Sequence, residues 1–100
     1  MHSRDVSIVI PIYNEVETLP RLVERVREAM TPGWGDGEAA QFELVLVDDG
    51  SRDGSRKLLK SLAAQTPWLQ VRYLIRNYGQ STALQAGFDA ARGRFIVTLD

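Results

Sequence analysis

The sequence predicts an α/β fold in which an open parallel sheet carries helices on both faces. Three observations support this class: four short runs of apolar residues, longer amphipathic stretches between them, and polar turn residues at the junctions. The resulting order of elements is β-α-β-α-β-α-β. Right-handed crossovers leave few arrangements of the strands, and a Rossmann-like order of 3-2-1-4 is the one we expect.

The first half of the chain predicts two strands and one helix. Residues 6–10 are mostly β-branched and indicate a buried strand. Residues 18–30 place their apolar side chains on one helical stripe, with Thr18 as the expected N-cap. A loop rich in glycine over residues 31–40 ends this helix, and residues 42–47 predict the second strand.

The second half predicts two helices and two strands. A helix begins at Asp53 or Ser55 and continues to about residue 65, before a proline. Residues 71–75 predict the third strand. An alanine-rich helix follows over residues 80–92, capped by the glycine that comes next. Residues 95–99 predict the fourth strand.

The fourth predicted strand has no later helix or strand to cover it. An exposed apolar edge of this kind is a liability that natural domains usually avoid. We therefore expect that the 100 residues are the first part of a longer protein, or that the edge pairs with a partner.

The composition excludes several functional classes. Hydrophobic residues make up 44% of the chain and charged residues 25%, which excludes collagen-like, disordered and membrane-spanning proteins. The net charge of -1 provides no basic excess for binding nucleic acid or an anionic membrane. The absence of cysteine excludes disulfides and thiol chemistry. We expect a cytoplasmic protein.

Polar and acidic side chains follow all four predicted strands. The carboxyl ends of parallel strands meet at one edge of a sheet, where ligands bind. Acids gathered there repel one another unless a cation or a ligand joins them, and carboxylates suit Mg²⁺ or Mn²⁺ with a phosphate. The sequence therefore predicts a nucleotide and divalent-metal site. The residues concerned are Pro11, Tyr13, Asn14, Glu15, Asp48, Asp49, Gly50, Ser51, Arg76, Asn77, Tyr78, Gly79 and Asp100.

Each segment also has a purely structural interpretation. Residues 48–51 favour turns and could simply start a helix, and residues 11–15 could be an ordinary strand exit. Other nucleotide folds lack their motifs here, since neither G-x-G-x-x-G nor a P-loop is present. A phosphoacceptor receiver domain would place its acid pair after the first strand, whereas here the pair follows the second.

Together the segments resemble the N-terminal half of an inverting family 2 glycosyltransferase with the GT-A fold. The resemblance rests on the order and spacing of the motifs and spans nearly the whole chain. The block Arg-Asn-Tyr-Gly-Gln at residues 76–80 is most similar to the branch that transfers sugars to polyprenyl phosphates. The matching segments are residues 6–15, 46–55, 76–80, 86–87, 90–93 and 97–100.

The resemblance implies a nucleotide-binding role for nine residues. Tyr13 would pack on the base, and Glu15 would accept a hydrogen bond from a ribose hydroxyl. Asp49, with Val47 and Asp48 beside it, would accept a hydrogen bond from an N–H of the base. Three others, at the start of the third helix, would line the diphosphate side. The nine residues are Pro11, Tyr13, Glu15, Val47, Asp48, Asp49, Asn77, Gly79 and Gln80.

The resemblance also implies a reaction. Asp100 matches the first acid of the family's Asp-x-Asp motif, which binds Mg²⁺ or Mn²⁺ and the donor diphosphate. The parent enzyme would move a sugar from a UDP- or GDP-type donor to a polyprenyl phosphate, at the cytoplasmic face of a membrane. Residues 1–100 would form its nucleotide-sugar-binding portion, truncated and inactive alone, because the motif's second acid and the catalytic base have no counterpart here.

Two other classes of function stay open. One is a nucleotide-binding module that performs no transfer. The other is an interaction domain whose fourth strand recruits a partner, including a second copy of the chain, by edge pairing.

Overall fold

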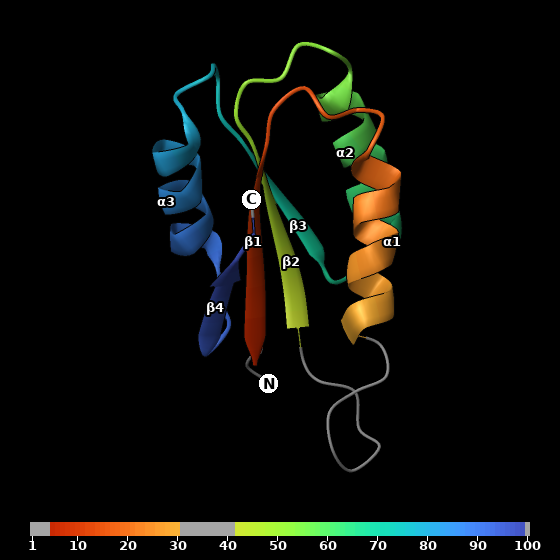
Figure 1. The fold of residues 1–100 in the computed structure, drawn as a ribbon, viewed down its shortest axis with the longest axis vertical. Coiled ribbons are helices and arrows are strands. Elements are labelled where there is room, and N and C mark those ends of the chain that lie inside the picture. Colours follow the sequence, from red (N-terminus) through yellow and green to blue (C-terminus); the bar gives the residue numbers. More distant parts are fainter. Residues whose placement is uncertain (1–4, 31–41, 100) are drawn as a thin grey trace.

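The fold is a four-stranded parallel sheet with helices on both faces (Figure 1). The structure is a computed structural model, which describes residues 5–30 and 42–99. The strands are β1 (Val6–Ile12), β2 (Phe42–Asp48), β3 (Leu69–Tyr73) and β4 (Phe95–Thr98). The helices are α1 (Leu19–Met30), α2 (Ser55–Gln65) and α3 (Gln80–Ala90).

The strand order is β3-β2-β1-β4, and every pair of neighbours is parallel, as the sequence predicts. Figure 1 shows α1 and α2 on one face of the sheet and α3 on the other. All three connections between the strands and the helices that follow them therefore lie at the carboxyl edge of the sheet. The predicted loop over residues 31–40 lies outside the described residues.

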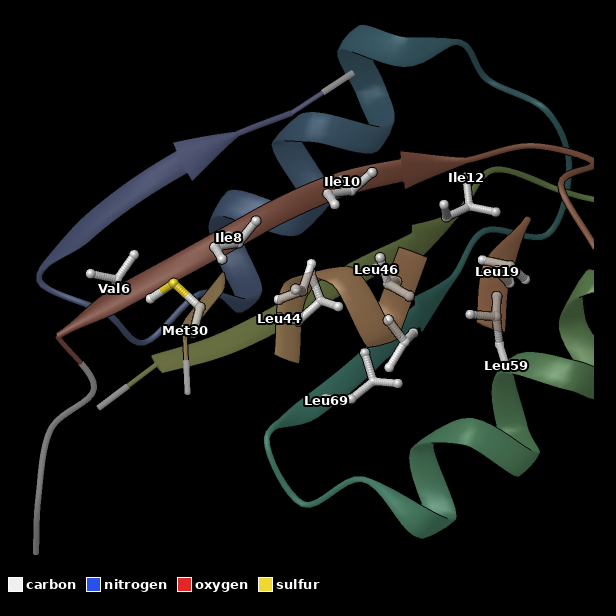
Figure 2. Close-up of a cluster of buried hydrophobic side chains, with 12 residues drawn as sticks. Val6, Ile8, Ile10, Ile12, Leu19, Met30, Leu44, Leu46, Leu59 and Leu69 are labelled. Carbon is white, nitrogen blue, oxygen red and sulfur yellow. The ribbon is translucent and has the colours of Figure 1, made fainter. Parts of the chain in front are cut away.

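Strand alternation divides the interior into two cores. On β1, Ile8 and Ile10 belong to the cluster that packs against α1 and α2 (Figure 2). Val9 points to the opposite face and packs under α3. Helix α1 contributes a stripe spaced for one helical face. That stripe is Leu19, Val23, Val26 and Met30, all buried. The buried side chains around Val9 are smaller, namely Val45, Val47 and Ala83.

Close packing of α3 on the sheet depends on a glycine. A Cβ on Gly87 would collide with a methyl group of Val9 and lie 3.2 Å from the side chain of Val47. The helix can therefore approach the sheet only because this position has no side chain.

Both ends of the third strand and the end of the third helix differ from the sequence prediction. The third strand is Leu69–Tyr73 rather than residues 71–75, because the chain leaves the sheet after one further hydrogen bond, from Leu74 N to Asp48 O at 2.9 Å. Ile75 is then 83% exposed. The third helix ends at Ala90, two residues earlier than expected.

Of the two predicted caps, one is wrong. Gly93 does not cap α3, because the C-cap is Ala91 and the Gly93 N–H donates to Ser7 Oγ at 2.7 Å. Thr18 does stand directly before α1, and its carbonyl accepts from Leu22 N at 2.9 Å, as expected at an N-cap. The Thr18 hydroxyl donates to the Glu15 carbonyl at 3.3 Å.

A buried polar row crosses the sheet near the amino ends of its strands. Glu43 is 4% exposed, and its carboxylate accepts from Ser7 Oγ at 2.6 Å and from Gln70 Nε2 at 2.9 Å. It also accepts from Arg92 N at 2.5 Å. These bonds hold the turn between α3 and β4 against the sheet.

None of the helices in the described part of the chain is long and apolar enough to cross a bilayer.

Candidate functional site

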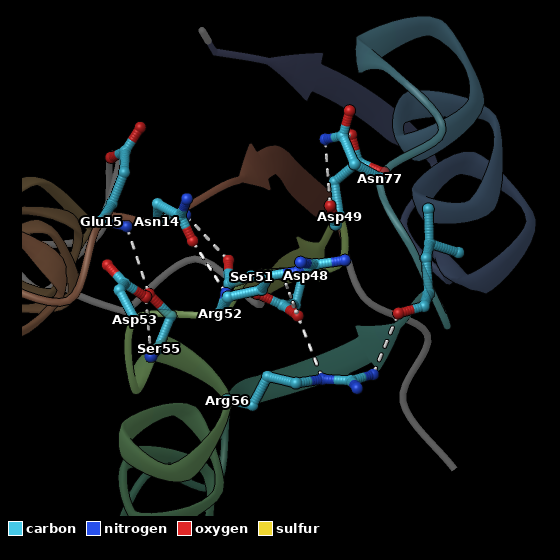
Figure 3. A network of polar contacts seen from close by, with 11 residues as sticks. Asn14, Glu15, Asp48, Asp49, Ser51, Arg52, Asp53, Ser55, Arg56 and Asn77 are labelled. Atoms are coloured by element: carbon cyan, nitrogen blue, oxygen red, sulfur yellow. Dashed lines mark hydrogen bonds and ion pairs between the residues drawn. The ribbon is translucent and has the colours of Figure 1, made fainter.

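The loops after β1 and β2 are joined at the carboxyl edge of the sheet by reciprocal hydrogen bonds (Figure 3). Asn14 adopts a left-handed conformation, with φ of 51°. Its N–H donates to Ser51 Oγ at 2.8 Å, and its Oδ1 accepts from Arg52 N at 2.8 Å. Asparagine tolerates this backbone conformation better than most residues. The motif residue Asn14 therefore acts as a clamp between the loops.

A second set of bonds extends the same junction toward α2. The N–H of Glu15 donates to Ser55 Oγ at 3.1 Å, and the N–H of Val16 donates to Asp53 Oδ2 at 3.2 Å. Ser55 Oγ in turn donates to Asp53 Oδ1 at 2.6 Å. This hydrogen bond from Ser55 is the main reason that the pKa of Asp53 lies below its usual value of 3.8.

The loop after β3 packs directly on Gly50. This glycine has φ of 75°, and a Cβ there would lie 2.7 Å from Arg76 Cα and collide with the next peptide group. Only glycine permits both the conformation and the approach. The three loops therefore form one contiguous surface.

Asp49 organises the loop before α3. Its side chain is 4% exposed, and its carboxylate accepts from Asn77 Nδ2 at 2.9 Å, Tyr78 N at 2.8 Å and Gly79 N at 3.0 Å. Asn77 Nδ2 also donates to the Asp49 carbonyl at 3.1 Å. The sequence predicts that Asp49 reads a base edge. In the structure most of its acceptor capacity is directed at the protein's own backbone.

These loops surround a cavity of about 270 Å³, here called the edge cavity. It opens above the carboxyl ends of β1 and β2, beside the start of α3. Its lining residues are Pro11, Ile12, Tyr13, Glu15, Asp49, Asn77, Gly79 and Gln80. Seven of the nine predicted nucleotide-binding residues are therefore brought together. The sequence did not predict Ile12 as a lining residue, because the predicted first strand ended at residue 10. Ile12 is buried, with 1% of its surface exposed, at the end of β1.

The other two predicted residues, Val47 and Asp48, do not line the edge cavity. Val47 is fully buried under α3. Asp48 points to the opposite face of the sheet from Asp49, where its Oδ2 lies 3.1 Å from Arg56 Nε. Asp48 Oδ1 is buried without a partner among the described residues. Strand alternation thus separates the two consecutive acids.

The alternation of side chains along β2 also divides the acidic residues that the sequence predicts to cluster. Glu15 and Asp49 share the edge cavity, whereas Asp48 is paired elsewhere. Asp100, the predicted metal ligand, lies outside the described residues. Among residues 5–30 and 42–99, no three acidic or histidine side chains gather closely enough to hold a metal ion.

A family model described as "Glycosyl transferase family 2" matches residues 7–100. The chain is 47% identical over 96 residues to an undecaprenyl-phosphate 4-deoxy-4-formamido-L-arabinose transferase of Pseudomonas fluorescens (strain SBW25). A protein of the same name from Shewanella sediminis (strain HAW-EB3) is 46% identical over 96 residues. These alignments cover 95% of this chain but only 27% and 28% of the two relatives.

Solved structures show the same fold at low sequence identity. The mannosyltransferase PcManGT from Pyrobaculum calidifontis, solved in complex with GDP-Man and Mn²⁺, superposes with a TM-score of 0.76 at 22% identity. The S. aureus protein TarS, residues 1-349, gives a TM-score of 0.76 at 24% identity. Each match covers 96% of this chain and 27% of the other. The GT-A architecture expected from the sequence is confirmed.

Proposed function

The chain belongs to glycosyl transferase family 2, and from this premise we propose that it binds the nucleoside-diphosphate sugar donor of a metal-dependent glycosyltransferase. The observation that supports the proposal best is the edge cavity, in which seven of the predicted residues converge from three loops. Residues 1–100 would form the nucleotide-sugar-binding portion of the whole protein. The donor would be of the UDP or GDP type.

The edge cavity offers the parts of a donor chemically suitable partners. The Tyr13 ring is 45% exposed, so one face is available to stack on a base. The exposed Glu15 carboxylate can accept a hydrogen bond from a ribose hydroxyl. Gly79 and Gln80 stand at the N-terminus of the 11-residue helix α3, where the helix dipole favours a diphosphate.

The proposed metal depends on Asp100 together with the donor's phosphates. A divalent ion bound there would neutralise the negative charge that develops on the departing nucleoside diphosphate. The proposed acceptor is a polyprenyl phosphate, by analogy with the relatives named as undecaprenyl-phosphate transferases. Such an acceptor would place the whole protein at the cytoplasmic face of a membrane.

Isothermal titration with UDP and with GDP in the presence of Mn²⁺ tests the proposal. We expect Glu15→Gln to weaken binding of the preferred nucleotide about five- to thirty-fold, because a charged acceptor of the ribose hydroxyl is lost. Glu17→Gln is the matched control, since it changes the same charge two residues away but does not line the edge cavity. Nucleotide binding that is absent, or equally affected by both variants, would contradict the proposal.

A further inference from the structure

A second cavity adjoins the edge cavity and shares Tyr13 and Asn77 with it. Its volume is about 330 Å³. Three arginines line it, and they come from different elements: Arg52 from the loop after β2, Arg56 from the first turn of α2, and Arg76 from the loop after β3. We call it the arginine cavity.

Much of the positive charge of the arginine cavity is uncompensated. Arg56 is paired with the buried Asp48, but no acidic side chain lines the cavity itself. Arg76 stacks over the Tyr78 ring, with its guanidinium carbon 5.2 Å from the ring centroid. Among the described residues, neither Arg52 nor Arg76 makes an ion pair. Both side chains are exposed, so their charges are available to a ligand.

Exposed apolar surface surrounds these charges. Ile75, which lines the arginine cavity, is 83% exposed. Tyr13 also lines it and is 45% exposed, and Tyr78, stacked under Arg76, is 44% exposed. Arginine beside tyrosine and an aliphatic side chain is the residue combination found where proteins meet the headgroup region of a membrane.

We propose that the arginine cavity binds the phosphate group of an anionic membrane lipid. Arg52 and Arg76 would pair with the phosphate oxygens, for which the planar guanidinium offers two parallel donors. The cavity volume equals that of roughly ten water molecules at about 30 Å³ each, which leaves room for a phosphate group. Ile75 would enter the boundary of the acyl chains, and this exposed apolar side chain favours a lipid over a free phosphate.

This binding would bring the opening of the edge cavity to the membrane surface. It requires no sugar transfer and no metal, so it can be tested separately from the proposed donor binding. The net charge of -1 gave no sign of this binding, because acidic residues elsewhere in the chain offset the three arginines. The folded chain brings those arginines together in one cavity. At about 0.1 M salt, charges farther than roughly 10 Å away are largely screened, so the local cluster decides the interaction.

The test is binding of the 100-residue chain to vesicles. We expect it to partition onto vesicles of phosphatidylglycerol with phosphatidylcholine, but not onto phosphatidylcholine alone. The double variant R52Q/R76Q should bind about thirty-fold more weakly, since each arginine near an anionic surface contributes about a five-fold effect. The matched control R21Q/R25Q removes the same charge from the exposed face of α1 and should bind as the unchanged chain does. I75S should reduce vesicle binding about five-fold.

Two further measurements separate the possible outcomes. Circular dichroism and UDP or GDP titration of R52Q/R76Q show whether the fold and the edge cavity are intact. Equal loss in R52Q/R76Q and R21Q/R25Q would overturn the proposal, as would unchanged binding in both. Complete competition by millimolar inorganic phosphate, with no effect of I75S, would show a site for free phosphate and would also overturn it.

Discussion

At the scale of single residues, the site depends on side chains that hold its loops in place as well as on side chains that only face the cavity. Asn14 and Asp49 direct their polar atoms at neighbouring backbone groups, and so fix the positions of the residues beside them. The sequence predicted that Asn14 and Asp49 lie together at the carboxyl edge of the sheet, but not that they hold the loops there. The spacing of a motif does not show whether a carboxylate accepts from a ligand or from the protein.

Gly50 permits the approach of two loops, so Gly50→Ala is expected to be strongly destabilising. The left-handed conformation costs an alanine about 1 kcal/mol, and the displaced backbone at Arg76 adds about 1–3 kcal/mol. Gly54→Ala is the control, since Gly54 also has a positive φ but its Cβ would meet only Val16 at 3.9 Å. Urea unfolding should show the larger loss for Gly50→Ala. Equal losses would mean that the close contact at Gly50 is unimportant.

Because of Asp53, we expect the free energy of unfolding to depend on pH in the acid range. Its folded pKa is lowered from 3.8 by the hydrogen bond from Ser55, so the unfolded chain binds a proton more readily than the folded chain. The stabilisation is therefore present above about pH 3.8 and is lost as the pH falls through the folded pKa.

The urea midpoint, measured between pH 7 and pH 2, tests this expectation. Asp53→Asn should flatten the acid part of the curve, whereas Asp89→Asn, on the exposed face of α3, should leave its shape unchanged. A direct titration of the Asp53 carboxyl carbon by NMR that gave a midpoint at or above 3.8 would show the sign to be wrong.

At the scale of elements, apolar periodicity predicted all seven helices and strands in the described part of the chain but misplaced some of their ends. β3 illustrates the reason. Ile75 and Leu74 extend the apolar run, yet the chain must leave the sheet to form the loop that Asp49 holds. Tertiary hydrogen bonds decide such boundaries, and a single sequence does not display them.

The buried Glu43 is expected to be essential for the turn between α3 and β4. Glu43→Ala would leave the hydroxyl of Ser7 and the N–H of Arg92 without their acceptor, and the Gln70 amide would keep only its bond to the Ala90 carbonyl. We expect a cost of about 3 kcal/mol or more. Glu24→Ala, in an exposed pair on α1, should change stability by less than about 0.5 kcal/mol.

Hydrogen exchange locates the effect of Glu43→Ala. The amides of Arg92 and Gly93 should lose protection first, because their acceptors belong to the polar row. A stability loss similar to that of Glu24→Ala would show that Glu43 is not needed to hold this turn.

At the scale of the whole molecule, β4 is an edge strand with no neighbour on its outer side among residues 5–30 and 42–99. Every residue of β4 is exposed, and Phe95, Ile96 and Val97 are 65%, 45% and 45% exposed. The strand order itself was predictable, because few right-handed arrangements exist. Whether the edge is covered by a partner is a property of the assembled protein, which residue patterns do not reveal.

We expect the purified chain to associate with itself through β4 at high concentration. Val97→Lys should restore a monomer, because a charge on an edge strand opposes pairing. Ile75→Lys is the control, since Ile75 is 83% exposed but lies off the sheet. Light scattering after size exclusion checks the mass of each variant. A monomeric unchanged chain at millimolar concentration would count against association through this edge.

The clamp at Asn14 also bears on the order in which contacts form during folding. Its two hydrogen bonds link positions 37 and 38 residues apart, so they can close only after β1 and β2 have paired. Contacts between residues so far apart in the chain form more slowly than the local contacts within a helix. A nucleotide bound as proposed would therefore stabilise only those chains in which the clamp has closed.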